Sequence, residues 1–169
     1  MIGIGSDDLG FALKERIREF LAQRGESVHD FGVYSPEPAD YPDIGVRVAE
    51  AVRSGLIERG VLVCGTGLGM AIVANKVSGV FAAPVNSVEL ATAARRSNDA
   101  QIITLGGRVV SPDEAAEIVE AWLAARFKGG GSSRKVAKVR LVEERYRRAR
   151  SSRALANADP ATLICAARG

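Results

Sequence analysis

A cysteine placed directly before a glycine-rich stretch is the feature of this sequence best suited to chemistry. Cys64 ends a short apolar run, and Gly65, Gly67 and Gly69 follow it. Glycines in such a turn let backbone N–H groups point inward, and a following helix adds the positive end of its dipole. The turn would then hold an anion, either a phosphate or an oxyanion formed during a reaction. A tight strand-to-helix connection with no ligand would use the same glycines.

Cys64 has two interpretations of its own. A helix N-terminus stabilises a thiolate, so this cysteine could act as a base or a nucleophile. It could equally be a small, buried, apolar residue at the end of a strand. The chain's other cysteine, Cys165, lies far away near the C-terminus, so the pair does not suggest a disulfide framework, and we expect no role for Cys165.

Polar residues follow or precede two other apolar runs. Asp7 and Asp8 could bind sugar hydroxyls and transfer protons, or could cap a helix that starts at residue 9. Asn98 and Asp99 come just before the fifth run, and we place them, like the other two loops, at a carboxyl end of the sheet. The single histidine, His29, lies in an alternating strand and is expected at the surface, which argues against a His-rich zinc site or a Ser-His-Asp triad.

Short apolar runs alternate with helical periods along the chain. This pattern predicts an α/β fold with a mostly parallel five-stranded sheet and helices on both sides. Residues 1–150 are expected to form one domain and residues 151–169 a tail. The expected strands are 1–5, 27–31, 60–64, 80–83 and 101–105, and the expected helices are 9–24, 44–53, 71–76, 88–96, 112–127 and 135–150.

The composition fits a single globular domain. The 169 residues are 47% hydrophobic and 25% charged, which excludes a disordered chain, and no apolar run approaches the ~20 residues that span a bilayer. We see no signal peptide and expect a cytoplasmic protein with no membrane partner. The glycine turn lacks the spacing and the downstream acid of a dinucleotide site.

The net charge of +3 has a local origin, in the basic segment 134–153. Such a run is usually a solvated helix face, and we expect no nucleic-acid partner. Arg134 and Lys135, which follow a Gly/Ser break, could instead reach a phosphate bound to a neighbouring subunit. The helix at 135–150 follows this break and has few layers of the domain left to join, so it is expected to pack on a partner subunit.

Several stretches together resemble one family. Residues 60–76, GVLVCGTGLGMAIVANK, are similar to the signature of the type B ribose-5-phosphate isomerases and galactose-6-phosphate isomerases. The resemblance covers residues 1–145 in register. The agreeing motifs elsewhere are Asp7…Gly10…Leu13-Lys14, Asp30-Phe31-Gly32, Asp40-Tyr41-Pro42, Asn98-Asp99-Ala100 and Leu105-Gly106-Gly107-Arg108-Val109.

This resemblance implies a Rossmann-like three-layer subunit that forms a homodimer or tetramer with shared active sites. It also implies a metal-free, cofactor-free aldose–ketose isomerisation of a sugar phosphate through an enediolate. Cys64 would move a proton between C1 and C2, and Thr66 would assist proton movement between the oxygens. The residues expected to stabilise the enediolate oxygen or line the sugar site are Asp7, Gly65, Gly67, Leu68, Gly69, Met70, Asn98 and Arg108.

Departures from the family pattern point to the substrate. Pentose-phosphate members have histidine at the positions of Asp8 and Ser97, the second of which opens the sugar ring. Part of their C-terminal phosphate clamp is also missing, since Gly131 and Lys135 stand at two arginine positions. A four-carbon sugar 4-phosphate has its O4 blocked, so it forms no such ring and needs no ring-opening base. We therefore expect an acyclic pair such as erythrulose 4-phosphate and erythrose 4-phosphate, with Asp8 and Ser97 in the sugar site and Lys135, with Arg134, on the phosphate.

Three alternatives remain at this stage. The chain could isomerise ribose 5-phosphate or a hexose 6-phosphate with other groups in place of the histidines. It could be a non-catalytic sugar-phosphate-binding subunit of a hetero-oligomer, although the presence of Cys64 and Thr66 argues against this. The basic terminal helix could bind nucleic acid, in which case binding should weaken steeply with salt.

Overall fold

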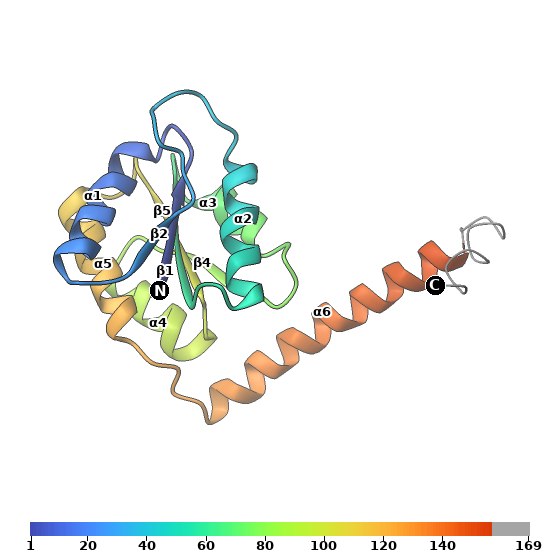
Figure 1. The fold of residues 1–169 in the computed structure, drawn as a ribbon. Coiled ribbons are helices and arrows are strands. Elements are labelled where there is room, and N and C mark those ends of the chain that lie inside the picture. Colours follow the sequence, from blue (N-terminus) through green and yellow to red (C-terminus); the bar gives the residue numbers. More distant parts are fainter. Residues whose placement is uncertain (157–169) are drawn as a thin grey trace. The chain divides into compact units, whose positions relative to one another are not determined.

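A central sheet of five parallel strands organises this protein (Figure 1). The computed structural model describes the backbone of residues 1–156 and the side chains of residues 1–149. The strands are β1 (Ile2–Ser6), β2 (Val28–Asp30), β3 (Arg59–Cys64), β4 (Ala82–Pro84) and β5 (Ile102–Gly106). The helices are α1 (Phe11–Gln23), α2 (Tyr41–Ser54), α3 (Leu68–Ala74), α4 (Val88–Asn98), α5 (Pro112–Ala124) and α6 (Gly131–Ala156).

The strand order is β2-β1-β3-β5-β4, so β1 and β3 lie side by side. β1 pairs with β3 from Ile2 opposite Arg59 to Ser6 opposite Val63, and Cys64 lies opposite Gly106 of β5. From β1 the chain crosses to β2 on one side, whereas β3 leads to strands on the other side. The order therefore reverses between β1 and β3, where open α/β sheets bind their ligands.

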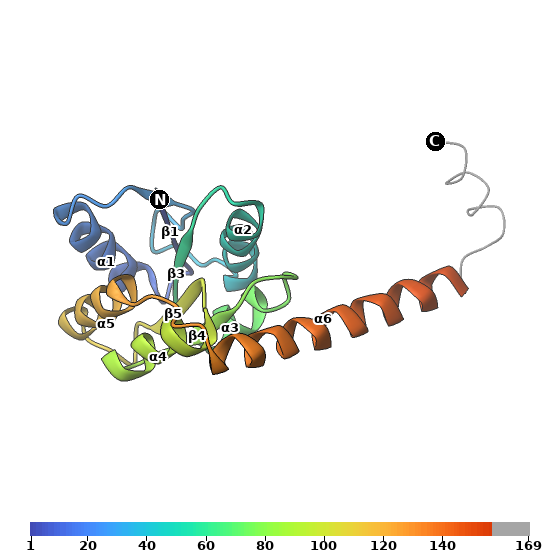
Figure 2. The same cartoon turned by 90° about the horizontal axis from the view of Figure 1, so that it is seen from below.

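Helices cover both faces of the sheet, as Figures 1 and 2 show. One hydrophobic core lies between the sheet and α1, α4 and α5, and Trp122 of α5 is fully buried in it. The second core lies under α2 and α3 and contains Leu62, Cys64 and Met70. Alternate residues of β3 from Val61 to Cys64 enter opposite cores, which explains the apolar run that follows Arg59. The expected three-layer Rossmann-like fold is confirmed, and the sheet is entirely parallel.

Local sequence signals explain where the best-defined helices start and stop. Ser111 and Glu114 form a reciprocal capping box at the start of α5, with Pro112 in the first turn. Gly55 ends α2 with a left-handed backbone, φ +77°. Helix α2 begins at Tyr41, three residues before the predicted start, because Pro42 fits a first helical turn. The predicted strand at 80–83 is shifted to Ala82–Pro84, and Val80 is instead a buried loop residue.

Helix α6 is longer than the predicted 135–150. It runs from Gly131 to Ala156, so it starts within the glycine stretch and continues into the predicted tail. Residues 157–169, including Cys165, lie outside the described residues. The chain divides into two compact units, Met1–Ser132 and a second that begins at Ser133. In the described part of the chain, no helix is both long and apolar enough to cross a membrane.

Candidate active site

Three loops meet at the carboxyl edge of the sheet. They follow β1, β3 and β5, and backbone hydrogen bonds join them. The Asp7 amide donates to the Val63 carbonyl at 3.3 Å, and the Gly107 amide donates to the Cys64 carbonyl at 2.8 Å. The Arg108 amide donates to the Gly65 carbonyl at 3.1 Å. The structure thus brings Asp7, the glycine turn and Arg108 together at one edge of the sheet.

The Cys64 thiol lies inside the glycine turn. Its side chain is buried, and Sγ accepts a hydrogen bond from the Gly67 amide at 3.1 Å. An N–H donor directed at sulfur stabilises negative charge on that sulfur. Helix α3 begins at Leu68, so the amides of Gly69 and Met70 have no partner inside the helix. The turn therefore holds a thiol next to the backbone N–H groups of the first turn of α3.

Glycine is required in this turn for steric reasons. Gly67 has φ +81°, and a Cβ there would lie 3.0 Å from the carbonyl carbon of Leu105. Gly10, at the start of α1, has a similar constraint, since its Cβ would lie 2.5 Å from the Val63 oxygen. Without side chains at these positions, the loop after β1 can approach β3 and the loop after β3 can approach β5 this closely.

Thr104 holds the turn from the neighbouring strand, and the sequence interpretation missed it. Its buried hydroxyl donates to the Gly67 carbonyl at 2.7 Å. A lone threonine within the otherwise apolar run of β5 was the available signal, because a buried hydroxyl needs a partner. Tyr41 was also missed: its ring lies against Gly69, where a Cβ would be 2.8 Å away.

The side chains of the turn face different environments. Thr66 and Leu68 are exposed at the rim, and the Leu68 amide donates to Thr66 Oγ1 at 3.4 Å. Met70 is fully buried in the core under α2 and α3, so its side chain is a packing residue. Met70 was expected in the site, but only its backbone amide, in the first turn of α3, lies at the glycine turn. Arg108 is exposed, and its Cδ lies 3.9 Å from where a Gly65 Cβ would be.

The two acids after β1 do different things. Asp7 is buried, and its Oδ1 accepts from the Gly10 amide at 2.8 Å, which is the helix-start role that the sequence left open. Burial raises the pKa of Asp7 above 3.8, and the nearby charge of Asp8 raises it further, against the hydrogen bond from Gly10. Asp8 accepts from the Ala39 amide at 3.3 Å, so it ties the loop after β2 to this edge.

Ser97 and Asn98 lie at the opposite edge of the sheet. They are exposed at the C-terminal end of α4, just before β5 begins at Ile102. The prediction that Asn98 and Asp99 lie at a carboxyl end was wrong, because a residue that precedes a parallel strand lies at its amino end. Arg134 and Lys135 are exposed on α6, in the second unit.

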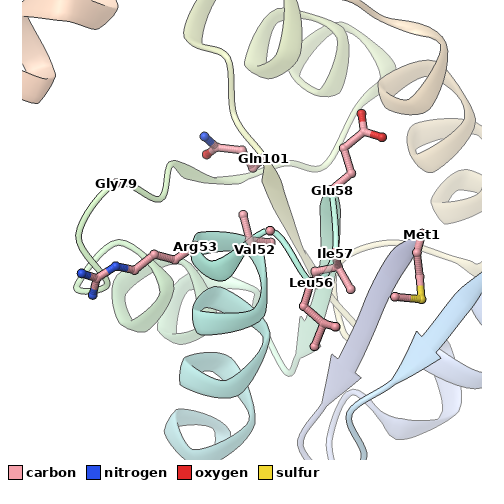
Figure 3. Close-up of a pocket in the computed structure, with 9 residues that line it drawn as sticks. Met1, Val52, Arg53, Leu56, Ile57, Glu58, Gly79 and Gln101 are labelled. Atoms are coloured by element: carbon pink, nitrogen blue, oxygen red, sulfur yellow. The ribbon is translucent and has the colours of Figure 1, made fainter.

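An open cavity of about 570 Å³ also lies away from the cysteine (Figure 3). The cavity is at the amino edge of the sheet: Met1 precedes β1, Ile57 precedes β3 and Gln101 precedes β5. Leu56 and Glu58 also line it. None of the predicted site residues takes part in this cavity. Among the described side chains, no group of three His, Cys, Asp or Glu residues is placed to hold a metal ion.

The fold and the site together define a class: a parallel α/β enzyme with a thiol in an amide-lined turn at the switch point of its sheet. A family model described as Ribose/Galactose Isomerase matches residues 2–139. The chain belongs to this family, and it is an isomerase, as the motifs around Cys64 predicted.

Individual relatives agree with this assignment. A D-erythrulose-4-phosphate isomerase of Pectobacterium atrosepticum is 47% identical over 144 residues, which cover 84% of this chain and 94% of the relative. A ribose-5-P isomerase B of Listeria innocua is 42% identical over 143 residues, 85% of this chain and 95% of the relative. The solved structure of Clostridium thermocellum ribose-5-phosphate isomerase B matches with a TM-score of 0.85 and 50% identity, covering 86% of this chain and 98% of that one.

Proposed function

We propose that this protein is an aldose–ketose isomerase of sugar phosphates that uses Cys64 as its base. The observation that carries the proposal is the hydrogen bond from the Gly67 amide to Cys64 Sγ. It supports a base whose sulfur lies against backbone N–H groups at the start of α3. An isomerase of this kind needs a base for a C–H proton and donors for the oxyanion that results.

The proposed reaction redistributes protons and electrons within the substrate. The thiolate removes the proton from the carbon next to the carbonyl, and the electron pair of that C–H bond forms the enediolate. Backbone amides of the turn stabilise the enediolate oxygen. The Thr66 hydroxyl, exposed at the rim, moves the proton from one oxygen to the other. Cys64 returns its proton to the neighbouring carbon, so no oxidant or reductant is consumed.

The other groups at this edge bind the sugar. The exposed Arg108 guanidinium lies beside Gly65 and can contact the substrate's polar groups. Asp7 is held by the Gly10 amide and can accept from a sugar hydroxyl through its remaining lone pairs. Leu68 and Gly69 complete the wall of the turn.

The substrate we favour is an acyclic four-carbon sugar phosphate, with erythrulose 4-phosphate as ketose and erythrose 4-phosphate as aldose. Neither Asp8 nor Ser97 is the histidine expected of a ring-opening enzyme, and a tetrose 4-phosphate has no ring of that kind to open. The relative from Pectobacterium atrosepticum is named D-erythrulose-4-phosphate isomerase, and this name supports the choice. The second candidate is ribose 5-phosphate, supported by the names of other relatives.

The site is proposed to be shared between two copies of the chain. Cys64 lies at the carboxyl edge of the sheet and Asn98 at the amino edge, and β5, with five residues, spans about 16 Å between the edges. One small sugar cannot reach both edges of one copy. Asn98, Ser97, Arg134 and Lys135 would therefore act on the substrate held by a second copy's turn. The exposed apolar side chains around the turn, Leu9, Leu68 and Val109, support a covered surface there.

The test is isomerase turnover on two substrates side by side, erythrulose 4-phosphate and ribose 5-phosphate. C64A and C64S should abolish turnover, whereas the same substitution at Cys165 should leave it unchanged. Faster turnover of the four-carbon substrate would support the acyclic choice, and equal or faster turnover of ribose 5-phosphate would favour the second candidate. Full activity of C64A, or no activity of the natural chain on either substrate, would overturn the proposal.

A further inference from the structure

Strand β3 carries functional groups at both of its ends. Its last residue is Cys64, and its first is Arg59, whose side chain is mostly buried at the amino edge. One guanidinium nitrogen of Arg59 donates to the carbonyls of Trp122 and Leu123, each at 3.0 Å. The other terminal nitrogen donates to the Ala125 carbonyl at 3.4 Å. Arg59 thus binds the end of α5 through three backbone oxygens.

The C-terminal end of helix α5 has one backbone cap, the Ala125 amide, which donates to the Ala121 and Trp122 carbonyls. The last carbonyls of a helix have no partners inside it, and a positive charge there is stabilising. The last turn of α5 contains no basic residue, and its C-cap residue, Ala125, already has an extended backbone. Arg59 supplies further donors, and a positive charge, from a strand more than 60 residues earlier in the chain. Its guanidinium also lies over the Trp122 ring, 5.3 Å from the centroid.

This placement of Arg59 has an electrostatic cost. Burial lowers the pKa of the Arg59 guanidinium, and the positive charges of Arg95 and Arg126 lower it further. Glu58 and Asp99 act in the opposite direction. A charged group in such surroundings destabilises the fold unless its hydrogen bonds are made. The hydrogen bonds to the three carbonyls of the α5 end therefore compensate for the burial of the Arg59 charge. Arg59 and the end of α5 hold each other in place.

The segment held in this way leads to the residues proposed for the second copy's substrate. After Ala125 the chain makes another contact, from the Lys128 amide to the Arg96 carbonyl at 3.1 Å. Arg96 directly precedes Ser97 and Asn98. Gly129 and Gly130 follow with positive φ, and α6 begins with Arg134 and Lys135 in its first turns. Arg59 and Lys128 together hold residues 125–128 against the end of α4, next to Ser97 and Asn98.

We infer that Arg59 is a positioning residue for the substrate-binding groups that this chain supplies to a neighbouring copy's active site. This inference rests on the proposed function, since it needs a shared site. It assigns the two ends of β3 to two different active sites: Cys64 to the site of its own copy, and Arg59, through the α5 end, to the site of the other copy.

The first test is the kinetics of R59M. Loss of the three hydrogen bonds should misplace Ser97 and Asn98, so the KM for the sugar phosphate should rise roughly ten-fold while kcat changes less than about two-fold. R53M, which removes an exposed arginine from the last turn of α2, is the matched control and should leave both constants unchanged. A general loss of stability would instead lower the active fraction and kcat. If R59M does not fold, R59K, which keeps the charge but has a single donor nitrogen, should show a smaller rise in KM.

The second test distinguishes the two copies. Hybrids of C64A with R59M, purified through two different tags, contain one site that combines an intact Cys64 with the intact Arg59 of the other copy. Activity with the natural KM is expected from that site. If the hybrid retains the raised KM of R59M, Arg59 acts within its own copy and the inference is wrong, although the isomerase itself stands. Failure to recover any hybrid, or a chain that is monomeric while fully active, would also overturn it. Turnover by C64A alone would overturn the proposed function instead.

Discussion

The Gly67 amide lies 3.1 Å from Cys64 Sγ, while the Gly67 carbonyl accepts the Thr104 hydroxyl at 2.7 Å. One residue with a left-handed backbone thus connects the thiol to the neighbouring strand. The position of the thiol depends on a peptide unit that only glycine can supply without strain.

The first prediction concerns this glycine. G67A should lower the free energy of unfolding and reduce kcat by more than about ten-fold, since the turn must move to relieve the contact with Leu105. Chemical denaturation and steady-state kinetics measure the two effects. G25A is the matched control, because Gly25 also has positive φ, +73°, but has nothing within 4 Å of a Cβ. It should cost about 1 kcal/mol and leave kcat unchanged. Equal effects from both variants would mean that the turn tolerates a side chain.

The second prediction concerns the pH dependence of stability at Asp7. Its pKa is raised above 3.8 in the folded state, so the stability it contributes is complete below pH 3.8 and is lost as pH rises through the folded pKa. D7N cannot ionise, and its Oδ1 can still accept from Gly10. Its melting temperature should therefore exceed that of the natural protein at pH 7, and the difference should vanish towards pH 3.8.

A set of thermal melts between pH 3 and pH 8 measures this effect. D8N should give part of the same stabilisation, because Asp8 contributes to the raised pKa of Asp7. If D7N were less stable at pH 7, and increasingly so as pH rises, the sign of the shift would be wrong.

The third prediction concerns Lys14, which is fully buried between α1 and the loop after β2. Its ammonium group donates to Asp30 Oδ2 at 2.8 Å and to the Val33 carbonyl at 2.7 Å. K14M leaves a partly buried carboxylate and a carbonyl without this partner, so it should destabilise the protein by about 3 kcal/mol. K76M, at an exposed position, should change stability by less than about 0.5 kcal/mol. Urea titration compares the two variants. Similar unfolding midpoints would contradict a stabilising role for the buried Lys14–Asp30 pair.

The fourth prediction concerns substrate choice. If the absence of two histidines excludes cyclic sugars, then S97H, alone or with D8H, should raise turnover of ribose 5-phosphate relative to erythrulose 4-phosphate. General acid–base catalysis contributes about 10²-fold or more, so a detectable gain is expected even from imperfect placement. T92H, on the same helix as Ser97, is the control for adding an imidazole to α4 and should not change the ratio. An unchanged ratio in S97H/D8H would locate the choice of substrate elsewhere.

The sequence predicted the fold because its signals are local. A buried parallel strand between two cores needs an apolar run, and residues 60–64 of β3 form one. The glycine turn after Cys64 was visible for the same reason, since three glycines at alternate positions have few other uses. Helix bounds were less accurate: α6 extends to Ala156, and Pro42 lies inside the first turn of α2 where a loop was expected.

Contacts between distant segments could be seen only in the tertiary structure. The sequence alone determined the order of the elements, the thiol beside its amide-rich turn and the family. It placed Asn98 at the wrong edge, because the edge depends on the direction of β5 and not on neighbouring residues. Thr104 and Arg59 act through backbone groups 37 and 63 residues away, respectively. Local periodicity records which side of a helix or strand is buried, whereas the order of strands in the sheet decides which residues become neighbours.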